Sequence, residues 1–225
     1  MEHPAILNQP FEKIIWKNKS PNEQLNNDNE IIQQDSSIYM LDNYNMMNQF
    51  NEIMFTSDIN PSSINFLLRI ISSISNLEEL QRPKSIILYI DSPGGNLKDC
   101  FKFIDYILIW KKKYNIKLIT VALGSIASAA TLMHIIGDEK YITKNTECLI
   151  HELSFDTSGK YTECIGEFKY MTDINNNLIN IYLDYNKKIT RDKLELLLKN
   201  STWFTSKEYI DAGFADNYLD IKYIL

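Results

Sequence analysis

Three short segments of the chain carry groups that could do chemistry together. Ser128 lies where a buried strand is expected to become a helix, beside the positive end of the helix dipole. His151, one of three histidines, follows the apolar run 147–150, and an imidazole at a strand end can serve as a general base. Gly94 and Gly95 follow another apolar run, where no side chain screens the backbone N–H groups. Together these segments could supply a nucleophile, a base and an oxyanion pocket.

Two of these segments also have a purely structural interpretation. A glycine pair is common in tight turns, and a serine among small residues at a helix start often acts only as a cap. A competing base is His134, six positions after Ser128. On a shared helix the His134 side chain would point in a different direction from that of Ser128 and would not face it. This predicts a packing or surface role for His134.

Composition excludes several classes of partner and cofactor. The net charge is −6 and the only compact basic run is at residues 111–113, so we expect no nucleic-acid partner. The three cysteines are far apart and form no Cys-x-x-Cys pair, which argues against a disulfide framework, a zinc site or another metal site. Nothing in the sequence calls for a cofactor. The uncharged stretch 118–136 is interrupted by Gly124 and Ser125, which favours a buried strand followed by a helix over a membrane span.

Strand-like and helix-like patterns alternate along most of the chain. Residues 1–36 are rich in Asn and Gln and predict a mobile N-terminal extension, with one domain over residues 37–225. Strands are expected at 53–55, 85–90, 118–123, 147–152 and 203–204. Helices are expected after Pro61, from Leu97 to the lysines at 111–113, at 128–136, at 161–187, after Thr190, and from Thr205 to Gly213. This order predicts an α/β fold with a mostly parallel sheet and crossover helices.

Several motifs, in the right order, resemble one family. Residues 89–95 read Tyr-Ile-Asp-Ser-Pro-Gly-Gly, similar to the Tyr-Ile-Asn-Ser-Pro-Gly-Gly of ClpP, the proteolytic subunit of the ATP-dependent Clp protease. The spacing from Gly124 to Ser128 resembles the nucleophile segment of that family, and residues 149–151 resemble its Met-Ile-His. Residues 203–205, with Gly213 and Asp216, resemble its C-terminal motif. The resemblance spans about residues 38–220 and implies the ClpP/crotonase-type fold of repeated strand-strand-helix units, with a projecting handle helix at 161–187.

The resemblance implies a serine peptidase site with one altered member. Ser128 would be the nucleophile and His151 its general base, with oxyanion donors at the N–H groups of Gly95 and Ala129. The position of the triad aspartate falls on Ser201, next to Asn200. Asp184 and Asp192 are the substitutes that could be considered, but triad geometry disfavours both. A neutral third member predicts severe impairment.

Other departures from the family pattern point the same way. Glu152-Leu153 replaces the usual Gln-Pro, and residues 154–159 replace a glycine-rich segment that aligns substrate. These features resemble the catalytically degenerate ClpR type. We therefore expect a Clp protease ring subunit with impaired or absent peptidase activity. The alternatives are an active serine endopeptidase subunit of the ClpP type, and CoA-thioester chemistry on the same fold, which would leave Ser128 and His151 unexplained.

The resemblance also implies partners and a location. Heptameric rings would contain this chain, an active ClpP paralogue, or both, and an AAA+ Clp ATPase chaperone would deliver unfolded polypeptide. We expect no membrane partner. The family's chaperone-docking positions fall on Ile87, Tyr89, Val121, Leu123, Tyr141 and Leu219. The expected location is a plastid, with mitochondrion and cytoplasm as alternatives.

Overall fold

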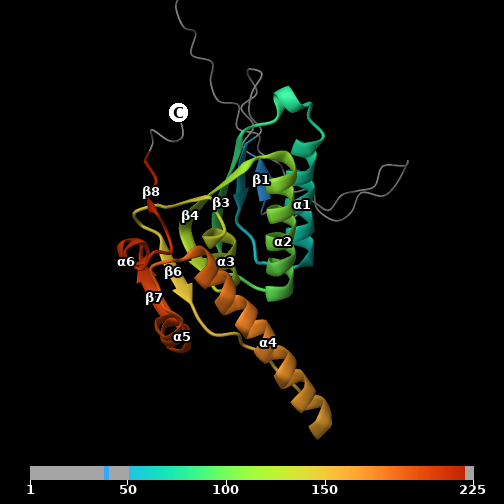
Figure 1. Ribbon diagram of the computed structural model, residues 1–225, viewed down its shortest axis with the longest axis vertical. Helices are drawn as coiled ribbons and strands as arrows, with labels where there is room; N and C mark the ends of the chain where they lie inside the picture. The colour runs from blue at the N-terminus through green and yellow to red at the C-terminus, as the bar shows by residue number, and fades with distance from the viewer. Residues whose placement is uncertain (1–37, 41–50, 221–225) are drawn as a thin grey trace, which may run out of the picture. The chain divides into compact units, whose positions relative to one another are not determined.

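The fold is a mixed α/β arrangement in which helices pack against one sheet (Figure 1). The structure, a computed structural model, describes residues 38–40 and 51–220, all within the compact unit Asp35–Leu225. The extension predicted for residues 1–36 lies outside the described residues. The predicted α/β class with a mostly parallel sheet is confirmed.

Within the described residues the sheet has eight strands, and most of its pairings are parallel. Its main path runs β1-β2-β3-β4-β5-β8, while β6 pairs with β4 and β7. Among the described strands, the β1–β2 and β6–β7 pairings are the antiparallel ones. The strands are β1 (Ile38–Met40), β2 (Glu52–Phe55), β3 (Ser85–Ser92), β4 (Lys117–Ala127), β5 (Glu139–Ile142), β6 (Glu147–Ile150), β7 (Thr202–Thr205) and β8 (Asn217–Tyr218).

Local capping signals set the starts of several helices. Asn60 accepts hydrogen bonds from the first-turn N–H groups of α1, and Asn96 does the same for α2. Thr205 and Glu208 form the capping box expected for α6. The helices are α1 (Pro61–Ser75), η1 (Glu79–Gln81), α2 (Leu97–Tyr114), α3 (Ala129–Ile135), α4 (Tyr161–Tyr185), α5 (Arg191–Lys199) and α6 (Ser206–Asp211).

The two faces of the sheet carry separate apolar clusters. Successive side chains of a strand point to opposite faces, so Ile86, Leu88 and Ile90 of β3 join the main core with α1, α2 and α3. Ile87 and Tyr89 point the other way and join a smaller cluster. This alternation explains why β3 reads as a continuous apolar run.

Strand β4 is longer than expected and pairs with two different strands. The sequence predicts a strand at 118–123, but β4 continues to Ala127. Its first part pairs with β5, whereas Ser125–Ala127 pair with β6. Between them the register with β3 shifts at Gly124, which has φ +61°. The Asp91 carboxylate accepts from the Ser125 N–H at 3.0 Å and holds this irregularity in place.

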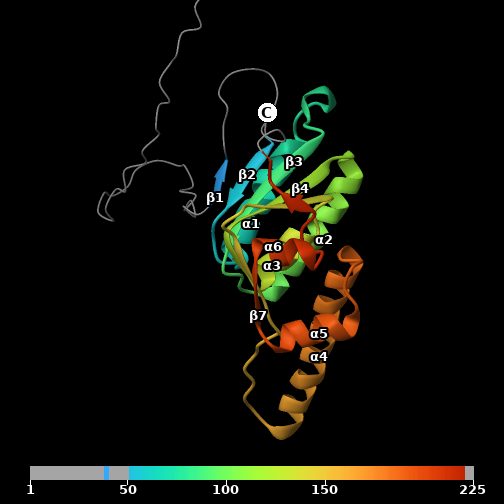
Figure 2. The same ribbon diagram turned by 90° about the vertical axis from the view of Figure 1, so that its left-hand side faces the viewer.

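The long helix α4 is buried at one end only and extends beyond the sheet (Figure 2). Its C-terminal half packs on the core through Ile174, Leu178, Ile179 and Tyr182. Its N-terminal half exposes Tyr161, Ile165, Phe168 and Tyr170. The apolar stripe predicted from the sequence therefore faces the protein core only in its second half.

Three strands of the described part were absent from the sequence-based prediction: β1, β5 and β8. β5 has four residues, two of them charged, and β8 has two residues, so neither has a recognisable period. The uncharged stretch 118–136 divides between β4 and α3, and none of the described helices is long and apolar enough to cross a bilayer. Cys100 and Cys148 are buried, which raises the pKa of both thiols, and Cys164 is half-buried.

Candidate active site

The three predicted segments lie at the carboxyl ends of three neighbouring strands. β3 leads to the glycine pair, β4 leads to Ser128, and β6 leads to His151. β4 pairs in parallel with both β3 and β6, so the carboxyl ends of the three strands meet at one edge of the sheet. In open α/β sheets this edge is the usual place for a binding site.

Ser128 occupies a strained turn between β4 and α3. Its backbone has φ +55° and ψ −128°, a conformation that is unusual for a residue with a side chain. Its N–H donates to the Leu149 carbonyl at 2.9 Å, which ties the turn to β6. The capping role considered for its hydroxyl is wrong, because the side chain makes no cap hydrogen bond. The hydroxyl is therefore left available at the entrance of α3.

The glycine pair packs directly against the turn that carries Ser128. A Cβ added to Gly94 would lie 2.5 Å from the Ala127 oxygen and 2.8 Å from the Ser128 Cβ. The Gly94 carbonyl accepts from the Ile59 N–H at 2.7 Å, which anchors the turn to the β2–α1 connection. Only glycine fits here, because φ is +94° and there is no space for a side chain.

The two expected oxyanion donors both line the cavity beside Ser128. The Gly95 N–H makes no hydrogen bond within the described residues. Ala129 is the first residue of α3, where N–H groups lack an intrahelical acceptor. Two N–H groups on either side of a hydroxyl suit a tetrahedral oxyanion.

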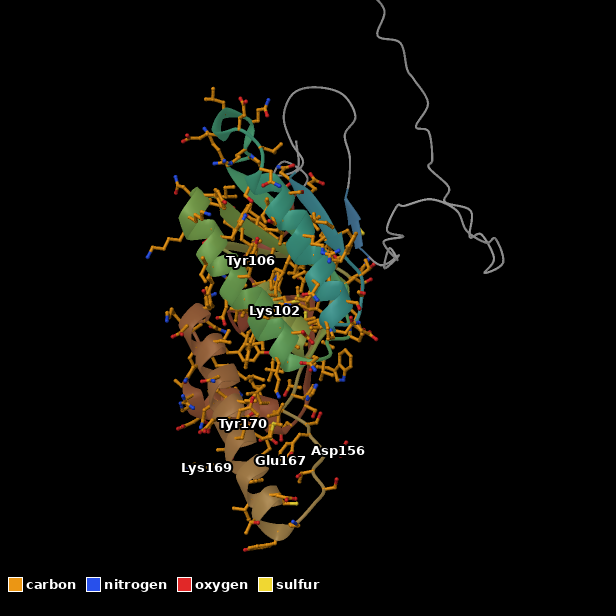
Figure 3. The ribbon with its side chains drawn as sticks, turned by 90° about the vertical axis from the view of Figure 1, so that its right-hand side faces the viewer. Lys102, Tyr106, Asp156, Glu167, Lys169 and Tyr170 are labelled. Atoms are coloured by element: carbon orange, nitrogen blue, oxygen red, sulfur yellow. The ribbon has the colours of Figure 1, made fainter. Side chains whose placement is uncertain are left out.

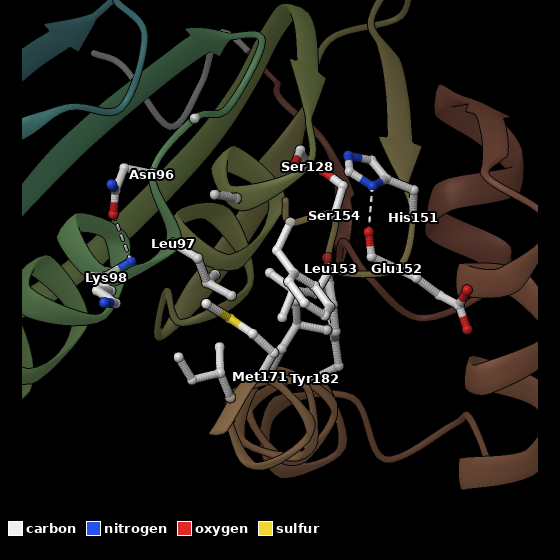
Figure 4. Close-up of a pocket in the computed structure, with 15 residues that line it drawn as sticks. Asn96, Leu97, Lys98, Ser128, His151, Glu152, Leu153, Ser154, Met171 and Tyr182 are labelled. Atoms are coloured by element: carbon white, nitrogen blue, oxygen red, sulfur yellow. Dashed lines mark hydrogen bonds between the residues drawn. The ribbon is translucent and has the colours of Figure 1, made fainter. Parts of the chain in front are cut away.

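His151 lines the same cavity, and its ring is held by the backbone. Its Nδ1 lies 2.6 Å from the main-chain oxygen of Glu152. Figure 4 shows the ring beside Ser128, with this bond on the side of the ring away from the serine. No hydrogen bond joins Ser128 to His151 in the described part of the chain. Such bonds often tighten only when substrate binds.

The cavity next to these groups is lined by both polar and apolar residues. Its volume is about 350 Å³, and residues of α2 and α4 form much of its wall (Figure 4). The Tyr182 hydroxyl is hydrogen-bonded to that of Thr131, which joins α4 to α3 behind the cavity. Its apolar lining includes Leu153 and Phe155 from the segment after His151. The rest comes from helices whose apolar residues the sequence patterns assign to packing: Leu97, Met171, Ile174, Leu178 and Tyr182.

Ser201 does not line this cavity. Its side chain is exposed and, among the described residues, forms no hydrogen bond with His151. The antiparallel register of β6 and β7 ends at the pair Ile150 and Thr202, so Ser201 follows one position beyond the last pair, on the side of His151. Its φ is +49°. The predicted third member is thus close in register but makes no hydrogen bond with the ring among the described residues.

The segment after His151 lies along the exposed half of α4 rather than forming a strand. Figure 3 shows the segment with Asp156 beside the part of α4 with Glu167. The Thr157 hydroxyl donates to the Glu167 carboxylate, and Phe155 packs against Phe168 with ring centroids 6.3 Å apart. These contacts fasten the segment that stands in place of the family's substrate-aligning residues.

His134 belongs to the core and not to the site. It is fully buried, and its Nε2 donates to the Tyr141 carbonyl at 2.9 Å. Burial lowers the pKa of His134 to about 4, with a smaller opposing effect from the hydrogen bond to Tyr141. Of the two roles expected from its helical position, packing is confirmed and a surface role is wrong.

The predicted docking positions gather on the sheet face opposite α1 and α2. Five of the six positions belong to, or pack against, the smaller apolar cluster. Leu123 is half-buried and is not part of the cluster. The cluster, called here the second-face cluster, consists of Ile87, Tyr89, Val121 and Tyr141, with Met54, Ile119 and Leu219 packed against it.

Comparisons with known proteins agree with this geometry. A model of the Clp protease family matches residues 34–222. The ATP-dependent Clp protease proteolytic subunit of Streptococcus thermophilus is 25% identical over 171 residues, covering 74% of this chain and 83% of that protein. Proteolytic subunit 1 of Protochlamydia amoebophila is 26% identical over 155 residues, covering 67% and 73%. That of Leifsonia xyli is 26% identical over 136 residues, covering 60% and 66%. The chain belongs to the Clp protease family.

Proposed function

We propose that this chain is a ring subunit of an ATP-dependent Clp protease whose own peptidase site is weakened. The observation that carries the proposal is the partner of the His151 Nδ1, which is a neutral main-chain carbonyl and not a carboxylate. A carboxylate at this place stabilises the imidazolium that forms when the serine is deprotonated. A neutral oxygen does this less well, so we expect slow turnover and not silence.

The rest of the site supports some remaining chemistry. The Ser128 hydroxyl would attack the scissile carbonyl while its proton passes to the Nε2 of His151. The N–H groups of Gly95 and Ala129 would stabilise the oxyanion, and Nε2–H would then protonate the leaving amine. The apolar cavity next to the serine favours a substrate with an apolar side chain before the cleaved bond.

The proposal is tested by labelling and turnover in the same sample. We expect a fluorophosphonate probe to label Ser128 slowly, and a fluorogenic peptide with leucine before the cleaved bond to be hydrolysed at a low rate. The matched control is Ser128→Ala, which should lose both signals. Turnover as fast as that of an active ClpP would contradict the weakened site. Complete absence of labelling in a correctly assembled ring would contradict the remaining chemistry.

Assembly into rings is supported by the exposed half of α4. Ile165 and Phe168 are 54% and 63% exposed on this helix, more than a solitary subunit would be expected to leave in water. We propose that these side chains are covered by other subunits, either copies of this chain or an active paralogue. Native mass measurements, with and without such a paralogue, distinguish the two compositions.

We propose that a Clp ATPase chaperone docks on the second-face cluster. Met54 and Ile119 are only partly buried there, so replacing both by serine should weaken binding while the main core stays intact. Burying an apolar side chain contributes about 1.5–3 kcal/mol, so we expect at least about a tenfold loss of affinity. The measurement is titration of the rings with a Clp ATPase.

The matched control for docking is an apolar side chain elsewhere on the surface. Leu80 on η1 is 96% exposed and lies outside the cluster, so Leu80→Ser should leave the affinity unchanged. Equal affinities for the Met54→Ser/Ile119→Ser double variant and the parent chain would exclude this face as the docking site.

A further inference from the structure

The hydrogen bond between His151 and the backbone determines which ring nitrogen carries the proton. A carbonyl oxygen can only accept, so the 2.6 Å contact with the Glu152 oxygen requires a proton on Nδ1. In neutral imidazole the other nitrogen, Nε2, then has the lone pair. This is the tautomer that a general base needs when it faces a serine hydroxyl.

We propose that the main-chain carbonyl of Glu152 is a positioning group that replaces one of the two functions of a triad carboxylate. It fixes the tautomer and the orientation of the His151 ring, but it brings no negative charge to stabilise the imidazolium. The inference rests on the proposed function, because a tautomer matters here only if Ser128 reacts. It explains how a site without its carboxylate keeps a ring ready to accept a proton.

The carbonyl is held in place by the same elements that hold His151. The Glu152 N–H donates to the carbonyl of Leu198 at 3.1 Å, and Leu198 is buried on α5. On the other side, Ile150 is paired with Thr202 of β7. The Glu152 N–H is therefore anchored to α5 and the strand before His151 to β7, which restricts where residue 152 and its carbonyl lie.

No side chain among the described residues competes for the Nδ1 proton. Ser201 is exposed and makes no hydrogen bond to the ring. The carboxylate of Glu152 itself extends away from the imidazole, as Figure 4 shows. It lies instead in a second cavity lined also by Glu195 and Lys199. The backbone oxygen is thus the acceptor that the ring uses.

The first measurement reads the tautomer directly. In the assembled full-length protein with ¹⁵N-labelled histidine rings, we expect the His151 signals at neutral pH to be those of a ring protonated at Nδ1. The His151→Gln variant assigns these signals by removing them. A ring protonated mainly at Nε2 would overturn the inference even if the protein cleaves peptides.

The second measurement weakens the carbonyl without touching any side chain. Replacing Leu153 by its α-hydroxy acid turns the Glu152 carbonyl into an ester carbonyl, which is a poorer acceptor. The Leu153 N–H makes no hydrogen bond in the described residues, so no other bond is lost. We expect a shift of the His151 signals toward the Nε2–H form and about a fivefold to tenfold lower kcat, with KM unchanged.

A matched ester elsewhere in the same segment separates a local effect from general loosening. Glycolic acid in place of Gly159 changes a peptide whose N–H and preceding carbonyl make no hydrogen bond within residues 51–220. It should leave both the tautomer and kcat unchanged. If the ester at Leu153 alters neither, the positioning role is wrong. A third outcome separates the two proposals. If the ester at Leu153 shifts the tautomer, but the parent chain neither hydrolyses the peptide nor reacts with the fluorophosphonate probe, the proposed peptidase function is wrong. The assignment of the Glu152 carbonyl as the acceptor then still stands.

Discussion

Replacing Ser201 by aspartate is expected to raise peptidase turnover by about 100-fold or more. Removing the charge of a triad carboxylate costs serine proteases about 10⁴ in kcat, so restoring one should recover a large part of that factor. The gain should appear in kcat and not in KM, because Ser201 does not line the substrate cavity. The measurement is steady-state hydrolysis of the leucine peptide by assembled rings.

The backbone at position 201 is suited to an aspartate. Its φ of +49° lies in the left-handed region, which aspartate and asparagine tolerate better than most residues. One position beyond the pair Ile150 and Thr202, residue 201 is on the same side as His151. Its side chain is exposed, so a charged group there needs no burial.

The control is Ser201→Asn, which has nearly the shape of aspartate without its charge. It should stay near the parent rate, and the Ser128→Ala/Ser201→Asp double variant should be inactive. If Ser201→Asn is as fast as Ser201→Asp, shape and not charge limits the site. If neither changes the rate in intact rings, the missing carboxylate is not the cause of slow turnover.

The second large effect concerns stability and comes from His134. Its pKa falls from 6.5 to about 4 in the folded protein because the ring is desolvated. The unfolded chain therefore binds more protons between these pH values, so the free energy of unfolding should fall as the pH drops from about 6.5 to about 4. The full loss from this group is on the order of 3 kcal/mol.

The contacts of His134 determine which variant can serve as the control for this pH dependence. Lys140 lowers the pKa of the ring and Asp216 raises it, while Tyr209 packs against it at a ring distance of 5.7 Å. His134→Gln keeps a donor for the Tyr141 carbonyl but does not titrate. Chemical unfolding at a series of pH values should show a smaller decrease for the variant than for the parent. Parallel curves would show that His134 does not contribute.

Much of the fold could be predicted because most elements have strong local signals. The apolar run of β3, the Asn60-Pro61 start of α1 and the Thr205–Glu208 capping box each lie where expected. β5 and β8 could not be predicted, because two to four residues in a sheet are defined by their neighbours. The extension of β4 beyond residue 123 was not predicted, because it passes through Gly124 and a glycine usually weakens or interrupts a strand.

The candidate site could be predicted only where residue type carries the information. Ser128, His151 and the glycine pair come together at one sheet edge as expected, and their catalytic roles stay predictions. The Glu152 carbonyl could not be found, because every residue has a backbone oxygen and only the path of the chain selects one. The cavity wall from α4 was likewise invisible, since its apolar residues look the same whether they face a core or a ligand.

The exposure of Ser201 bears on how such a chain changes over evolutionary time. Gly94 lies against the Ala127 oxygen, the Ser128 Cβ and the Ala129 nitrogen, so we expect nearly any mutation there to damage the fold around the site. The side chain at position 201 is exposed, so we expect its exchange to leave the shape of the protein intact. On the catalytic role proposed for position 201, a gene duplicate would lose or regain speed at one surface codon while selection for the common architecture continues.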